Sequence, residues 1–166
     1  MSTSNMGSVA NYARWIAVLR IVLGGLFLYA GIPKLVKLFA DSAYMAENLK
    51  WMHDKAWPPG YAHFLTIITH NDTLVVLFGV LVAVGETAVG IGLILGLFTR
   101  LSAFFGAVMN ANYLFAVYKA SPGFLSSNNF WFTVLHIFFI GTAAGRAWGL
   151  DALVVPKLPK WLRWLG

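Results

Sequence analysis

Four long apolar runs constrain this chain more than any other feature of its sequence. They extend roughly over residues 15–38, 74–98, 101–118 and 130–147. Each run is close to the ~20 residues that a helix needs to cross ~30 Å of hydrocarbon. Because lipid offers no hydrogen-bond partner to the backbone, such segments are expected to be helical. The runs therefore predict an all-α, polytopic membrane protein, with one domain over residues 1–166 built as a bundle of four transmembrane helices.

The composition agrees with a chain made for lipid. Hydrophobic residues make up 59% of the sequence, charged residues only 11%, and the mean hydropathy is +0.72. A soluble domain has about a quarter of its residues charged. The first apolar run is too long for the ~7–15-residue core of a signal peptide, and it contains Arg20, so we expect a retained span. The absence of cysteine excludes thiol catalysis, iron–sulfur ligation and cysteine-ligated zinc.

The basic residues flank the apolar runs and indicate the topology. The net charge is +6, and this distribution favours anionic lipid headgroups as the partner rather than nucleic acid. Four spans place both termini on one side, where six basic residues lie against five on the other side, or seven if Arg20 is included. We expect a multi-pass protein of the inner (cytoplasmic) membrane with both termini in the cytoplasm. The six are Arg14, Arg100, Arg146, Lys157, Lys160 and Arg163, and the five are Lys34, Lys37, Lys50, Lys55 and Lys119.

The segments outside the runs are expected to lie at the two membrane surfaces. Residues 39–73 predict two short helices in the outer interface, separated by the Pro-Pro-Gly break at 58–60 and anchored by tryptophans. Residues 148–166 alternate basic residues with tryptophans and predict an inner-surface anchor. Asp151 is the only acidic residue expected at that surface, and we expect it to pair with Arg100 or Arg146.

Three histidines occur in the outer segment. His53, His63 and His70 follow one another at intervals of ten and seven residues. These intervals match no compact motif of zinc or copper ligands. We interpret the three as polar residues of the membrane interface and predict no metal site.

Each apolar run also carries one polar residue at depth. Glu86 lies ~20 Å from the inner boundary, Asn110 ~15 Å, His136 ~16 Å and Arg20 ~9 Å, at 1.5 Å per residue. A carboxylate facing lipid would cost several kcal/mol, so Glu86 is expected to face the bundle or to be protonated. Asn110 shares its helix face with small residues, whereas Asn112 points some 200° away. We predict that Glu86 forms a hydrogen bond with Arg20, Asn110 or His136.

Two interpretations of these polar residues remain open. They can form a structural network that holds the helices in register. They can also form a site for a hydrophobic ligand with a polar head, such as a quinone. In that site Glu86 would be the catalytic group, because a glutamate–histidine pair can move protons, and Arg20, Asn110 and His136 would complete the ligand-binding set.

Three stretches of the sequence resemble the DoxX/DoxD family. They are "LRIVLGGLFLYAGIPKL" in the first run, "GETAVGIGLILGLFTR" in the second, and "GRAWGLD" after the fourth. The resemblance covers roughly Arg14 to Asp151. The residues that match its pattern are Arg20, Gly24, Gly31, Lys34, Glu86, Gly90, Arg100, Arg146 and Asp151.

The resemblance implies a small four-helix membrane protein, and its DoxD branch includes a subunit of thiosulfate:quinone oxidoreductases. The chain would then be a membrane subunit of a quinone-linked oxidoreductase, with other membrane subunits as partners. Quinone would be its ligand, with no cofactor of its own. A chain without cysteine needs electrons from another subunit, so we expect no self-sufficient enzyme. The alternative is a non-catalytic accessory subunit that stabilises a larger respiratory or photosynthetic membrane complex.

Overall fold

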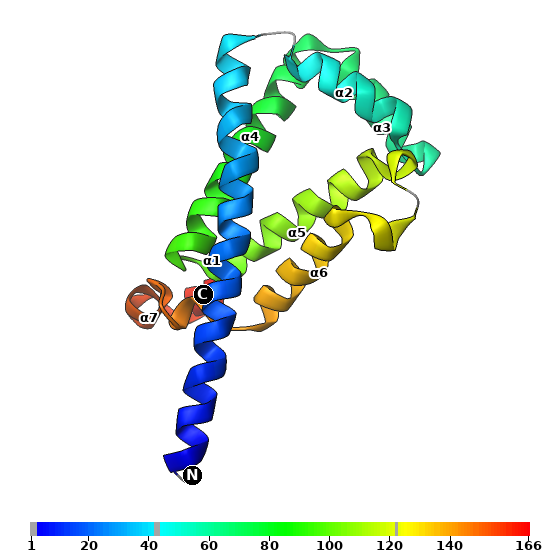
Figure 1. Cartoon of the computed structure of the whole chain (residues 1–166). Coiled ribbons are helices and arrows are strands. Elements are labelled where there is room, and N and C mark those ends of the chain that lie inside the picture. Colours follow the sequence, from blue (N-terminus) through cyan, green and yellow to red (C-terminus); the bar gives the residue numbers. More distant parts are fainter. Residues whose placement is uncertain (1–2, 42–43, 122) are drawn as a thin grey trace.

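A computed structural model describes residues 3–41, 44–121 and 123–166, and this part of the chain contains helices and turns but no strand (Figure 1). The all-α prediction is confirmed. The main helices are α1 (Thr3–Ala40), α4 (Asp72–Leu95), α5 (Thr99–Ala116) and α6 (Asn128–Gly141). Shorter elements are α2 (Tyr44–Lys55), α3 (Pro59–Thr69), α7 (Asp151–Val154) and the 3-10 turns η1 (Tyr118–Ala120), η2 (Phe124–Ser126), η3 (Ala144–Arg146), η4 (Val155–Lys157) and η5 (Lys160–Leu165).

The main helices are arranged as two pairs. Helix α1 packs along α4, and α5 packs along α6. A tight turn joins α4 to α5, and from this turn the two pairs diverge (Figure 1). Helices α2 and α3 contact both α4 and α5, and they bridge the wide end of the arrangement (Figure 1). The two pairs therefore form a wedge, and α2 and α3 lie across its wide end as a helical roof.

Glycines allow α1 and α4 to approach closely. A Cβ atom added to Gly24 would lie 2.9 Å from the carbonyl oxygen of Gly90, and one added to Gly31 would lie 2.9 Å from the amide nitrogen of Thr87. Small residues at such positions are a common means of close helix packing in membranes. These contacts set the antiparallel register, in which the C-terminal part of α1 faces Glu86 and the part around Arg20 faces the C-terminal end of α4.

Two of the helices meet the length and hydropathy expected of a membrane span. They are Asn11–Ala40 within α1 and Asp72–Leu95, which is α4. Helix α5 has 18 residues and α6 has 14, so the fourth apolar run is helical only in its first part. The two short helices expected within residues 39–73 are confirmed as α2 and α3, and α3 begins at Pro59, where a missing N–H does no harm.

Candidate functional site

Glu86 is buried in α4 and is held by two side chains from other helices. Its side chain accepts hydrogen bonds from Lys34 Nζ at 2.6 Å to Oε1 and 2.7 Å to Oε2. The Tyr113 hydroxyl donates to Glu86 Oε1 at 2.8 Å, and Lys34 Nζ donates to the same hydroxyl at 3.0 Å. We refer to Lys34, Glu86 and Tyr113 as the triad. Each member comes from a different main helix.

The triad explains how a carboxylate is tolerated in the bundle. A buried charge is stable only when it is paired and its remaining hydrogen-bonding capacity is used. The Glu86 side chain is 4% exposed and faces the Lys34 ammonium, whose three hydrogen bonds use all of its protons. Gly31 lies one turn before Lys34, and a Cβ added there would be 3.0 Å from Glu86 Cβ. The glycine therefore brings α1 close enough for a direct ion pair.

The predicted partners of Glu86 are wrong among the described residues. Glu86 bonds Lys34 and Tyr113, not Arg20, Asn110 or His136. Lys34 lies 14 residues, or ~21 Å, beyond Arg20 on α1, and the glycine contacts bring its level to Glu86. The sequence held a signal for Lys34, which stands in the family pattern and on the Arg20 face. The count of flanking charges instead places Lys34 at the outer surface.

Glu86 and Asn110 do line one cavity, together with the other two triad members and Asn129. This polar cavity has a volume of about 240 Å³, and its apolar wall is formed by Leu26, Phe27, Ala30 and Phe132. Asn110 is buried and donates to the Gly106 carbonyl oxygen at 2.9 Å. The Asn129 side chain has no hydrogen-bond partner within the described residues. Two of the four predicted site residues are thus brought together.

Arg20 lies elsewhere, at the C-terminal end of α4. It is fully buried, and its Nη1 donates to the carbonyl oxygens of Leu93 and Ile94. Its Nη2 donates to the Trp148 carbonyl oxygen at 3.1 Å and to that of Ala147 at 3.4 Å. Carbonyl groups at a helix C-terminus lack helical partners and carry partial negative charge. Arg20 therefore ties α1 to the end of α4 and to the segment after η3.

His136 is also fully buried and does not line the polar cavity. Its Nδ1 lies 2.7 Å from the Phe132 carbonyl oxygen and so acts as a donor, which leaves a lone pair on Nε2. The ring packs edge-on against Phe27 with 4.8 Å between centroids, and it lies where a side chain on Gly106 would be. Nε2 has no hydrogen-bond partner among the described residues. His136 thus supports Phe27, which forms part of the cavity wall.

Asp151 does not form the predicted ion pair. It is fully buried, and it accepts hydrogen bonds from the backbone amides of Phe98 at 2.7 Å and Thr99 at 3.0 Å. No salt bridge joins it to Arg100 or Arg146 in the described part of the chain. The amides at the start of a helix lack partners and carry partial positive charge, so a carboxylate is favoured there. Asp151 therefore caps α5.

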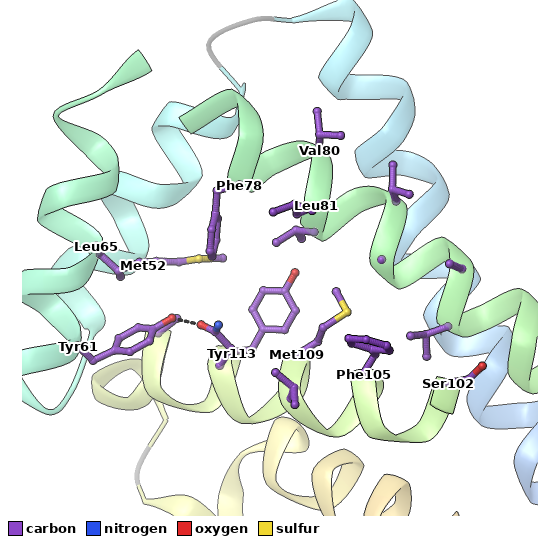
Figure 2. A pocket seen from close by; sticks show the side chains of 18 of the residues that line it. Met52, Tyr61, Leu65, Phe78, Val80, Leu81, Ser102, Phe105, Met109 and Tyr113 are labelled. Atoms are coloured by element: carbon purple, nitrogen blue, oxygen red, sulfur yellow. Dashed lines mark hydrogen bonds between the residues drawn. The ribbon is translucent and has the colours of Figure 1, made fainter. Parts of the chain in front are cut away.

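A second, larger cavity of about 720 Å³ lies between α4 and α5 beneath α2 and α3, and we call it the α4–α5 cavity (Figure 2). Tyr113 lines this cavity as well as the polar one and extends from α5 toward α4 (Figure 2). At the roof, the Tyr61 hydroxyl donates to Asn112 Oδ1. Burial raises the pKa of Tyr61 to about 12, so this hydroxyl stays protonated at neutral pH. Tyr113 separates the two cavities.

The family model described as "TQO small subunit DoxD" matches residues 15–165. The chain belongs to the DoxD family. The match includes the triad, Arg20 and Asp151, so the DoxD sequence pattern covers the sites described above. Searches of curated proteins and of solved structures give no match. Membership of DoxD, together with the apolar helices, indicates a membrane protein and suggests a subunit of a thiosulfate:quinone oxidoreductase type complex.

Proposed function

We propose that this chain is the membrane subunit of a quinone-linked oxidoreductase and that the quinone head group binds in the polar cavity. One observation carries the proposal. A triad of ammonium, carboxylate and phenol, with the carboxylate of Glu86 buried, lines a cavity that also contains the free amide of Asn129. A network that only held helices in register would need neither the cavity nor the unused amide.

The groups in the polar cavity suit both redox states of a quinone. The Asn129 amide can donate to a quinone carbonyl, and an oxygen of Asn110 can accept from a quinol hydroxyl. Leu26 and Ala30 are exposed at the edge of the cavity, where an apolar tail could leave into lipid. The cavity therefore offers a polar contact for the head and an apolar exit for the tail.

The triad would transfer the protons that the reaction takes up. Reduction of a quinone to a quinol takes up two electrons and two protons, and we propose that the electrons come from another subunit of the complex. Lys34, Tyr113 and Glu86 form one hydrogen-bonded path along which a proton can move. Glu86 is the catalytic group in this proposal, because its carboxylate lines the polar cavity and can exchange a proton with a bound head group and with Tyr113. Arg20 and His136 act as positioning residues.

The proposal includes the full membrane arrangement. All four apolar runs of the single domain would cross the inner membrane, with both termini in the cytoplasm. Exposed basic residues and tryptophans of residues 148–166 support an anchor among anionic headgroups at the cytoplasmic surface. Helix α6 is only ~21 Å long, less than the ~30 Å hydrocarbon core. Neighbouring subunits would cover the part of the bundle surface that α6 is too short to cover.

The test replaces Glu86 by Gln in the native complex, with Glu47→Gln as the control on an exposed glutamate of α2. The amide keeps the shape of the side chain but cannot carry the charge. We expect quinone-dependent turnover to be lost while the subunit stays in the complex. If turnover survives and the complex dissociates, the triad is structural and the chain is an accessory subunit.

A further inference from the structure

We propose that the α4–α5 cavity is a second binding site, which takes an uncharged long-chain molecule with a carbonyl or hydroxyl head group. The site is separate from the polar cavity, because Tyr113 forms the wall between them. It does not depend on the function proposed for the triad. Three features of the cavity support this assignment: its shape, the polar groups at one end, and a lining without lysine or arginine among the described residues.

The shape of the cavity favours a flexible chain. The lining extends from Phe78 to Val89 on α4 and from Leu101 to Ala116 on α5, a length of ~17–23 Å. Met52, Tyr61 and Leu65 of the roof close one end (Figure 2). A partner helix is ~10 Å wide and straight, so it would meet the roof. A single hydrocarbon or isoprenoid chain can follow the cavity beneath it.

The side of the cavity is open toward lipid. Val84 on α4 is 49% exposed, as is Val108 on α5, and Phe105 is 51% exposed. All three line the cavity. A ligand can therefore enter sideways between α4 and α5 without leaving the hydrocarbon layer.

The polar groups of the cavity gather mainly near its roof. Asn112 Oδ1 accepts a hydrogen bond from the Tyr61 hydroxyl, and Asn112 Nδ2 has no hydrogen-bond partner among the described residues. An amide N–H in apolar surroundings needs an acceptor, because an unpaired N–H there lacks the hydrogen bond that water would supply. A carbonyl or hydroxyl oxygen of a ligand would satisfy it. Because lipid is as apolar as the cavity, this hydrogen bond and close packing would retain the ligand.

The polar end carries no free cation among the described residues that line it. The Lys34 ammonium, which bonds the cavity-lining Tyr113, uses its three protons on Glu86 and Tyr113. Phosphate head groups are bound by arginine or lysine, which the cavity lining lacks. A neutral head group is therefore the better match, and a phospholipid is not.

The experiment uses the full chain in phosphatidylcholine nanodiscs and a long-chain alcohol that carries a photoreactive diazirine. Labelled peptides are identified by mass spectrometry, and we expect them to come from residues 78–89 and 101–116. Val84→Trp fills the cavity and should abolish this labelling. Val22→Trp is the matched control, because Val22 is 54% exposed on α1 and lines none of the cavities described here. It should leave the labelling unchanged.

Two further arms identify the ligand class. Asn112→Leu keeps the size of the side chain and should lower the affinity for the probe about 5–10-fold, which is the effect of one lost hydrogen bond. Decylubiquinone and unlabelled alcohol should compete with the probe, whereas phosphatidylglycerol should not. Uniform labelling along α1, labelling that survives Val84→Trp, or displacement by phosphatidylglycerol would each overturn the proposal. Because Val84→Trp leaves the triad intact, this result is independent of the Glu86→Gln test.

Discussion

The packing of α1 on α4 makes a sharp prediction at two adjacent glycines. A Cβ added to Gly24 would lie 2.9 Å from the carbonyl oxygen of Gly90 and from the amide nitrogen of Ile94. Real Cβ atoms almost never come so close, and backbone atoms cannot rotate away. A Cβ added to Gly25 meets nothing within 4 Å. Gly24→Ala and Gly25→Ala are therefore the same change in the same helix with opposite surroundings.

The difference between the variants isolates the cost of overpacking. Replacing glycine by alanine inside a helix stabilises it by roughly 0.5–1 kcal/mol, and this gain is common to both variants. Overpacking costs about 1–3 kcal/mol and applies to Gly24→Ala alone. We expect Gly24→Ala to be less stable than Gly25→Ala by ~1–3 kcal/mol. Gly24→Ala should also change the distance between Lys34 and Glu86, because that distance depends on how α1 packs against α4.

The measurement is a titration of each purified variant in mixed micelles with a denaturing detergent, followed by circular dichroism. Gly25→Ala should unfold at the same detergent fraction as the unchanged chain or at a higher one, and Gly24→Ala at a lower one. Equal midpoints for the two variants would falsify the close approach of α1 and α4. A lower midpoint for Gly25→Ala than for Gly24→Ala would mean that α1 presents another face to α4.

Three further predictions test other parts of the molecule. Glu86→Leu leaves the Lys34 ammonium without its carboxylate and should cost about 1–3 kcal/mol, measured by the same titration; equal stability of the Leu and Gln variants would contradict this. Asp151→Ala leaves two backbone amides of α5 without an acceptor and should also cost about 1–3 kcal/mol; a smaller loss than for an exposed aspartate would remove its role as a cap. In this cysteine-free chain, an impermeant thiol reagent added outside intact cells should label a cysteine at exposed His63 but not one at exposed Lys160. The reverse pattern would invert the proposed topology.

Much of the fold could be predicted because local composition decides it. Apolar runs near 20 residues have few alternatives to helix, and the break at 58–60 separates α2 from α3 as expected. The depth of a polar residue along its own helix follows from a fixed rise per residue. The inward-facing sides of Glu86 and Asn110 could also be predicted, because a charge facing lipid is costly and because Asn110 shares its helix face with small residues; both are buried.

The partners of these residues could not be predicted in the same way. Which residue of α1 faces Glu86 depends on the register between two helices, and contacts between Gly24, Gly31 and α4 decide that register. The partners of Asp151 could not be predicted for the same reason. Its position after α6 suggested a surface, but the chain returns to α4, where the Asp151 amide donates to the Gly96 carbonyl at 2.8 Å. This contact turns an expected surface charge into a buried cap of α5.

The sequence by itself determined the helical class, the family and the presence of inward-facing polar residues, because each depends on composition or on spacing within one segment. The tertiary structure alone decided that Lys34 and Tyr113 hold Glu86, that Arg20 binds the end of α4, and that Tyr113 stands between two cavities. These features depend on distances between helices far apart in the chain. Such distances are set by side-chain volumes at the contacts, where a single missing Cβ brings two backbones together.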